Sequence, residues 1–138
     1  MMAGGHKAPP AALVVDDEAA LLMLLAETLR DAGFQVYEAV SGEAALKLTE
    51  AHPDIALMVS DIRMPGMSGY QVASNVRSLH PEMKILLMTG YTDEAIPPSL
   101  VDAGIKLVFK PLDLDDFALL ASSMIDPCGG ADYAGPAR

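Results

Sequence analysis

The chain has 138 residues, 51% of them hydrophobic, and a formal net charge of -10. This length suits one compact domain with a sizeable core and leaves no room for a second. Nine basic residues against nineteen acidic ones argue against a nucleic-acid partner, because clustered Lys and Arg bind phosphate backbones. No run approaches the roughly 20 apolar residues of a membrane span, and no signal peptide is recognisable. A single cysteine, Cys128, rules out an internal disulfide. We therefore expect a cytoplasmic protein without a membrane partner.

The chain starts with small residues and then enters a first strand. Residues 1–10 contain Gly and Pro without a hydrophobic period, and we expect a flexible leader there. The apolar run Ala11 to Val15 is typical of a buried strand, and the acidic pair Asp16-Asp17 follows it directly. A helical pattern comes next, and Gly33 is placed to terminate it. The predicted buried face of this helix consists of Leu21, Leu25, Thr28, Leu29 and Ala32.

Two more strand and helix units follow. Phe34 to Ala39 predicts the second strand, and Ser41 predicts the N-cap of the next helix, because a serine hydroxyl accepts a hydrogen bond from the first helical turn. Ile55 to Ser60 predicts the third strand. Ser68 and Gln71 then have the spacing of a capping box, which predicts the start of a third helix.

The fourth and fifth strands are short and end in polar residues. Lys84 to Met88 predicts the fourth strand, which leads into Thr89. Leu107 to Phe109 predicts the fifth, which leads into Lys110. Between them stands Pro97-Pro98, which does not fit inside a regular helix, so any helix there is short.

A last helix is predicted from near Asp113 to a point before Pro127. Strands that alternate with helices in this way predict an α/β fold, a (βα)5 doubly wound, flavodoxin-like sheet of five parallel strands. Right-handed crossovers favour the strand order 2-1-3-4-5. We expect this domain to span residues 11–126 and a flexible tail to span residues 127–138.

In such a sheet, the ends of the first and third strands meet at a switch point where ligands bind. Asp16, Asp17 and Asp61 therefore converge on one crevice. Two unit charges about 4 Å apart repel by roughly 4 kcal/mol at an effective dielectric near 20, so the cluster favours a hard divalent cation. Mg²⁺ fits best, because it leaves open positions for phosphate oxygens. Thr89 and Lys110 add a hydroxyl and a cation at the same edge, which suits phosphoryl transfer to Asp61.

Four motifs occur in order, each at the end of its own predicted strand. They are Asp16-Asp17, the Asp-x-x-Met-Pro-Gly run that Asp61 opens, Thr89, and Lys110-Pro111. Together they resemble the receiver domain of the two-component response regulator family, over roughly Leu13 to Ile125. The resemblance fits both stand-alone regulators and receivers of hybrid histidine kinases. It implies a signalling domain that catalyses only its own aspartyl phosphorylation and dephosphorylation, and not an enzyme with other substrates.

The resemblance also implies roles for residues at the matching positions. Asp61 would accept the phosphoryl group. Asp17 and Asp61 would bind Mg²⁺ directly, and Asp16 would act mainly through water. The backbone carbonyl of Arg63 would complete the metal site.

Two further roles and the partners follow from the same resemblance. Thr89 would hydrogen-bond the phosphoryl group, and Lys110 would form an ion pair with it. The phosphoryl donor would be a phosphohistidine on a sensor histidine kinase or a histidine phosphotransfer protein. Output would pass to a downstream protein by direct contact or by onward phosphotransfer.

Some residues depart from the family pattern. Leu107 stands where many members carry a Phe or Tyr that turns inward on activation; Tyr91 is either a substitute for it or a surface loop residue. Pro97-Pro98 interrupts the helix that many receivers use to pair, so we expect a monomer or a weak homodimer. On the first helix, Leu22 and Met23 are expected to point away from the core, either as ordinary exposed residues or as a docking surface for a kinase.

Two other functions are compatible with the same residues. A phosphohydrolase would use Asp61 as a transient nucleophile on small phosphoesters, but such enzymes commonly place a second carboxylate at the position that Arg63 occupies here. A scaffold would keep the receiver shape and bind proteins without phosphate. The complete set of polar residues at the strand ends argues against the scaffold.

Overall fold

The computed structural model describes residues 9–90, 105–110 and 113–125. Most of the predicted leader, Tyr91, the Pro97-Pro98 pair, Pro111 and the predicted tail lie outside these ranges. Predictions about those residues therefore stay predictions.

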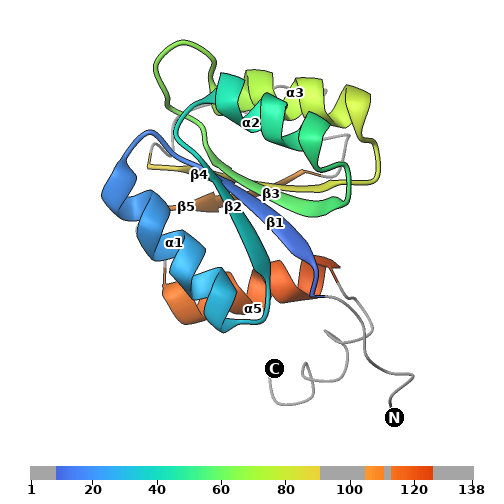
Figure 1. Ribbon diagram of the computed structural model, residues 1–138. Helices are drawn as coiled ribbons and strands as arrows, with labels where there is room; N and C mark the ends of the chain where they lie inside the picture. Colours follow the sequence, from blue (N-terminus) through green and yellow to red (C-terminus); the bar gives the residue numbers. More distant parts are fainter. Residues whose placement is uncertain (1–8, 91–104, 111–112, 126–138) are drawn as a thin grey trace, which may run out of the picture.

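In the described residues a helix follows each of the first three strands and the last one, and the elements are labelled in Figure 1. The strands are β1 (Ala11–Val15), β2 (Gln35–Ala39), β3 (Ile55–Asp61), β4 (Lys84–Thr89) and β5 (Lys106–Phe109). The helices are α1 (Ala19–Asp31), α2 (Gly42–Ala51), α3 (Gly69–Leu79) and α5 (Leu114–Ile125).

All neighbouring strands are parallel, and their order in the sheet is β2-β1-β3-β4-β5. The predicted α/β class, doubly wound topology and strand order are confirmed. The central strand β3 is buried at every position except Ala56, as expected for a strand with helices on both faces. The edge strand β2 alternates less regularly and is partly exposed, which explains its mixed polar and apolar sequence.

Two hydrophobic cores lie on opposite faces of the sheet. Figure 1 shows α2 and α3 over one face and α1 and α5 over the other. Strand residues contribute to the two cores alternately, because successive side chains of a strand point to opposite faces. Leu13, Met58 and Val76 belong to the core beneath α2 and α3. Val14, Leu57, Leu25 and Phe117 belong to the core beneath α1 and α5.

Local capping sets where the helices begin and end. The Ser41 hydroxyl accepts a hydrogen bond from the backbone N–H of Ala44 at 3.1 Å, at the start of α2. Ser68 and Gln71 form both hydrogen bonds of the predicted capping box at the start of α3. Gly33 follows α1 with a φ of 103°, a left-handed conformation that glycine adopts without strain.

The buried face of α1 differs from the predicted one. The sequence pattern points Leu22 away from the core, whereas only 4% of its surface is exposed. Met23 is exposed as predicted, at 60%, and its neighbour Leu24 is exposed at 46%. The buried stripe consists of Leu22, Leu25, Ala26 and Leu29. These residues stand at positions i, i+3, i+4 and i+7 and are all apolar, whereas the predicted stripe includes the polar Thr28.

Candidate functional site

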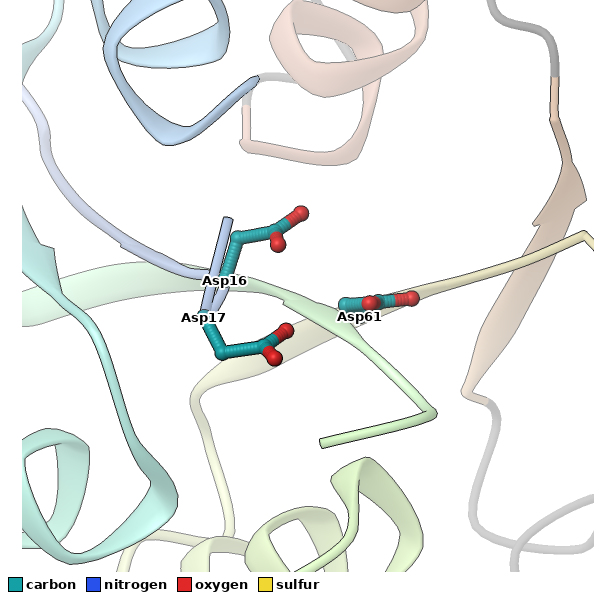
Figure 2. Close-up of side chains that lie close together, drawn as sticks. All are labelled: Asp16, Asp17 and Asp61. Carbon is teal, nitrogen blue, oxygen red and sulfur yellow. The ribbon is translucent and has the colours of Figure 1, made fainter. Parts of the chain in front are cut away.

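Three carboxylates meet at the carboxyl ends of two paired strands. β1 and β3 are parallel, with Val15 opposite Ser60, so the residues that follow them reach the same edge of the sheet. Figure 2 shows Asp16 and Asp17 after β1 and Asp61 on β3, with their carboxylate groups extending to the same side. One oxygen atom from each of the three lies within 4.8 Å of the others. The predicted convergence of these residues is present in the structure.

Asp16 is the most deeply placed of the three, with 0% of its surface exposed. Its Oδ1 atom accepts a hydrogen bond from the backbone N–H of Glu18 at 2.9 Å. Its Oδ2 atom is also buried and has no hydrogen-bond partner among the described residues. Burial raises the pKa of Asp16, and the negative charge of Asp61 raises it further, while the Glu18 hydrogen bond and Lys110 act in the opposite direction.

This donor set fits a small divalent cation. A buried carboxylate oxygen that has no partner in the described part of the chain, beside two more carboxylates, is a costly arrangement that a hard cation or its bound water would relieve. Oxygen ligands from carboxylates are those that Mg²⁺ prefers, and its hydration shell bridges donors that are not in direct contact. The acidic cluster is therefore consistent with Mg²⁺ binding.

A lysine at the β5 edge of the sheet adds a positive charge beside the carboxylates. Lys110 follows β5, and its Nζ atom lies 3.2 Å from Oδ1 of Asp61. The backbone N–H of Lys110 donates to the carbonyl of Thr89 at 2.7 Å, which fixes the end of β5 against the end of β4. Thr89 is buried at this end of β4 and pairs in register with Phe109. The predicted Thr89 and Lys110 are therefore on the same edge of the sheet as the carboxylates.

A hollow opens above these groups. Its volume is about 720 Å³, which accommodates a tetrahedral oxyanion together with a hydrated cation. Arg63 is exposed and lines the hollow beside Asp61. The full lining consists of Asp17, Glu18, Asp61, Arg63, Gly90 and Lys110.

Sequence reasoning missed three contributors to this region. Glu18 lines the hollow, and its position directly after the acidic pair could have indicated this. Ser60 is fully buried, and its hydroxyl donates to the backbone carbonyl of Asp61 at 2.9 Å. Gly69, the first residue of α3, lies against the Asp61 backbone. Neither Ser60 nor Gly69 carries a local sequence signal for such a contact.

Leu107, which departs from the family pattern, lies on β5 and is partly buried. It packs against the core beneath α2 and α3. The possible substitute for an aromatic ring at this point of β5, Tyr91, lies outside the described residues.

Comparison with known proteins gives a consistent result. The family model described as the response regulator receiver domain matches residues 12–121. The chain is 33% identical over 100 residues to sensor kinase CckA of Brucella abortus, covering 71% of this chain and 11% of that protein. It is 29% identical over 96 residues to sporulation initiation phosphotransferase F of Bacillus subtilis, covering 68% of this chain and 76% of that protein.

A solved structure shares the fold closely. The response regulator TrrA of Thermotoga maritima, crystallised in complex with Mg²⁺-BeF, superposes with a TM-score of 0.75 at 33% identity. The match covers 83% of this chain and 98% of TrrA. Several of the curated relatives are much longer: the chain spans 11% of CckA and 24% or less of two others.

Membrane insertion finds no support in the described helices. None of them combines the length and the apolar character that crossing a bilayer requires.

Proposed function

Because this chain belongs to the response regulator receiver domain family, we propose that Asp61 is the residue phosphorylated during two-component signalling. Receiver domains of this family are signalling domains, and the fold and the acidic cluster agree with that role. One observation carries the assignment to Asp61. Its carboxylate lies beside two other carboxylates and 3.2 Å from the ammonium group of Lys110, at the floor of an open hollow.

Mg²⁺ would be held by the carboxylates of Asp17 and Asp61 and by the backbone carbonyl of Arg63. Asp16 would act mainly through a water molecule, which would supply the hydrogen bond that its buried Oδ2 atom lacks among the described residues. When bound, the cation offsets the negative charge of the carboxylates and of the incoming phosphoryl oxygens. The known complex of TrrA with Mg²⁺-BeF, a relative at 33% identity, supports this choice of ion.

The chemical step is nucleophilic attack by an Asp61 carboxylate oxygen on the phosphorus atom of a donor phosphohistidine. The new O–P bond forms while the P–N bond breaks, and its electron pair stays on the imidazole nitrogen. Lys110 would move from its ion pair with Asp61 to the phosphoryl oxygens, where negative charge accumulates. Thr89 would donate its hydroxyl hydrogen to the same group. The product is an acyl phosphate on Asp61.

The donor in this proposal is a sensor histidine kinase or a histidine phosphotransfer protein. The similarity to the sensor kinase CckA and to a sporulation phosphotransferase supports that class of partner. A downstream protein would receive the signal, by contact with the phosphorylated domain or by onward phosphotransfer. We further propose that Met23 and Leu24, adjacent exposed apolar residues on α1, contribute to the contact with the donor.

The two alternative functions have less support. A phosphohydrolase of the type considered needs a second carboxylate two residues after the nucleophile, and the exposed Arg63 occupies that position. A phosphate-independent scaffold would not need Lys110 within ion-pair distance of Asp61. Unaltered partner binding by an Asp61→Ala variant would nevertheless favour the scaffold.

Intact-mass spectrometry after incubation with acetyl phosphate tests the proposal directly. We expect the wild type to gain one phosphoryl group in the presence of Mg²⁺ and none in the presence of EDTA. Asp61→Asn should gain none. Asp54→Asn is a matched control, because Asp54 is exposed and directly precedes β3 at the other end of the same strand. Modification that persists in Asp61→Asn would contradict the assignment, and continuous release of phosphate by the wild type would favour the phosphohydrolase.

A further inference from the structure

The peptide carbonyl of Asp61 is held from the α3 side of the sheet. The hydroxyl of Ser60 donates to this oxygen at 2.9 Å, and Ser60 is fully buried. By strand alternation, Ser60 shares its face of β3 with Met58, which belongs to the core beneath α2 and α3. The Asp61 carbonyl is therefore contacted from the face opposite to the side chain of Asp61.

Gly69 lies in close contact with the same peptide. A methyl group added to Gly69 would overlap the Asp61 carbonyl oxygen and would lie 2.8 Å from the Cα atom of Ile62. Both are backbone atoms, so they have no side-chain rotation with which to avoid the methyl group. The first residue of α3 thus lies directly on the main chain that carries Asp61, and only glycine allows this approach without a backbone shift.

Two backbone hydrogen bonds hold the same segment. The N–H of Ile62 donates to the carbonyl of Met88 on β4 at 3.0 Å, and the N–H of Gly69 donates to the carbonyl of Ile62 at 2.8 Å. The N–H of the Asp61–Ile62 peptide is consequently bonded to β4, and the carbonyl of the next peptide, Ile62–Arg63, is bonded to the start of α3. The position of the Asp61 side chain depends on the Asp61–Ile62 peptide, because the peptide plane contains the Cα atom to which the side chain is attached.

We propose that Ser60 and Gly69 are positioning residues that direct the Asp61 carboxylate toward Lys110 and the other carboxylates. This inference deepens the proposed function and rests on it for the effect on phosphorylation. Neither residue lines the hollow, so each acts through the Asp61 backbone rather than by contact with the reacting atoms. The geometry of the Lys110 ion pair is a property of the protein alone and can be measured without phosphate or metal.

Gly69→Ala is the direct test, and Gly42→Ala is its matched control. Each glycine is the first residue of its helix and follows a serine N-cap. A methyl group at Gly42 would meet the side chains of Val72 and Met67, at 2.6 Å and 2.9 Å, and not the Asp61 backbone. Both variants should unfold at lower urea concentrations than the wild type, because the added methyl group crowds neighbouring atoms. Only Gly69→Ala should slow phosphorylation by acetyl phosphate, by about tenfold or more, because small misplacements of a reacting group are costly.

A second readout uses the metal-free protein. The ¹³C resonance of the Asp61 carboxyl group should shift when Lys110→Ala removes the ammonium group, in the wild-type and Gly42→Ala backgrounds alike. In the Gly69→Ala background we expect this shift to be lost or strongly reduced. A wild type that takes up no phosphoryl group would contradict the proposed function, and the carboxyl resonance would still decide the role of Gly69.

Ser60→Ala keeps the test decisive if Gly69→Ala does not fold. We expect it to reduce the Lys110-dependent shift and the phosphorylation rate several-fold. Thr49→Val is its control, because Thr49 is also fully buried and donates its hydroxyl to a backbone carbonyl, that of Leu46 on α2. Wild-type shifts and wild-type rates in whichever of Gly69→Ala and Ser60→Ala fold would overturn the proposal. Equal losses in the controls, Gly42→Ala and Thr49→Val, would overturn it as well.

Discussion

Lys110 and Asp61 form an ion pair of 3.2 Å across the sheet, although β5 and β3 are not neighbours and β4 lies between them. The lysine side chain must therefore extend over the end of β4 to reach Asp61. In this position the ammonium group compensates one carboxylate of the cluster, and it also repels any cation that binds there.

Replacing Lys110 should therefore raise the affinity for Mg²⁺ and lower the rate of phosphorylation. We expect Lys110→Ala to bind Mg²⁺ several-fold more tightly, because a competing positive charge is removed. Phosphorylation by acetyl phosphate should fall by about 100-fold, the typical cost of losing one group that stabilises developing charge. Titration calorimetry and intact-mass kinetics measure the two effects. Lys106→Ala, at the exposed start of β5, should change neither, and a parallel fall of both in Lys110→Ala would contradict this account.

Asp16 should make the metal-free protein sensitive to pH. Burial raises its pKa in the folded state, so the folded protein holds this proton more strongly than the unfolded chain. The resulting stability is fully present below the unfolded-state pKa and is lost as pH rises through the folded-state pKa. At neutral pH in EDTA, Asp16→Asn should therefore be more stable than the wild type, by about 1 to 3 kcal/mol, the usual cost of a buried group without a partner.

Urea unfolding across a pH series measures this difference. The advantage of Asp16→Asn should shrink toward acid pH, where the wild-type carboxyl is protonated as well. The exposed Asp54→Asn should show no such trend. A variant less stable than the wild type at neutral pH would show that the buried charge is compensated in the folded protein.

Arg63 is predicted to slow the loss of phosphate from Asp61. It is exposed, follows Asp61 by two positions and lines the same hollow, through which water would have to approach a phosphoryl group on Asp61. Arg63→Ala should shorten the half-life of the phosphoprotein several-fold, as timed by mass spectrometry after removal of the donor. Lys47→Ala, an exposed cation on α2, serves as the control. Equal half-lives in all three proteins would remove Arg63 from this role.

The exposed apolar pair on α1 should affect transfer from a protein donor only. Changing Met23 and Leu24 together to Gln should slow phosphotransfer from a cognate histidine phosphotransfer protein by about tenfold, since it removes apolar contact area from the interface. Phosphorylation by acetyl phosphate should stay unchanged. Leu79→Gln is the control, because Leu79 is 63% exposed but lies at the end of α3. Equal slowing with both donors would point to a folding defect instead of a docking defect.

Local sequence signals were sufficient for most of the fold. The N-caps at Ser41 and Ser68 and the turn at Gly33 depend on residues within one helical turn, and all three occur as predicted. The convergence of Asp61 with Asp16 and Asp17 follows from topology, because parallel strands deliver their ends to one edge.

Other features depend on contacts between distant segments and were beyond sequence reasoning. Leu21 and Leu22 both lie on apolar stripes of α1, and packing against the sheet buries Leu22 fully while Leu21 is only partly buried at the margin of the same core. The contact of Gly69 with the Asp61 backbone likewise depends on how close α3 approaches β3. A glycine at the start of a helix gives no local indication of such an approach.

The sheet separates the interior into two cores that pack independently of each other. Among the described residues, no side chain belongs to both hydrophobic clusters. A change in packing around Phe117 or Leu25 can therefore be absorbed on that face of the sheet. The packing of α3 behind Asp61 then stays intact.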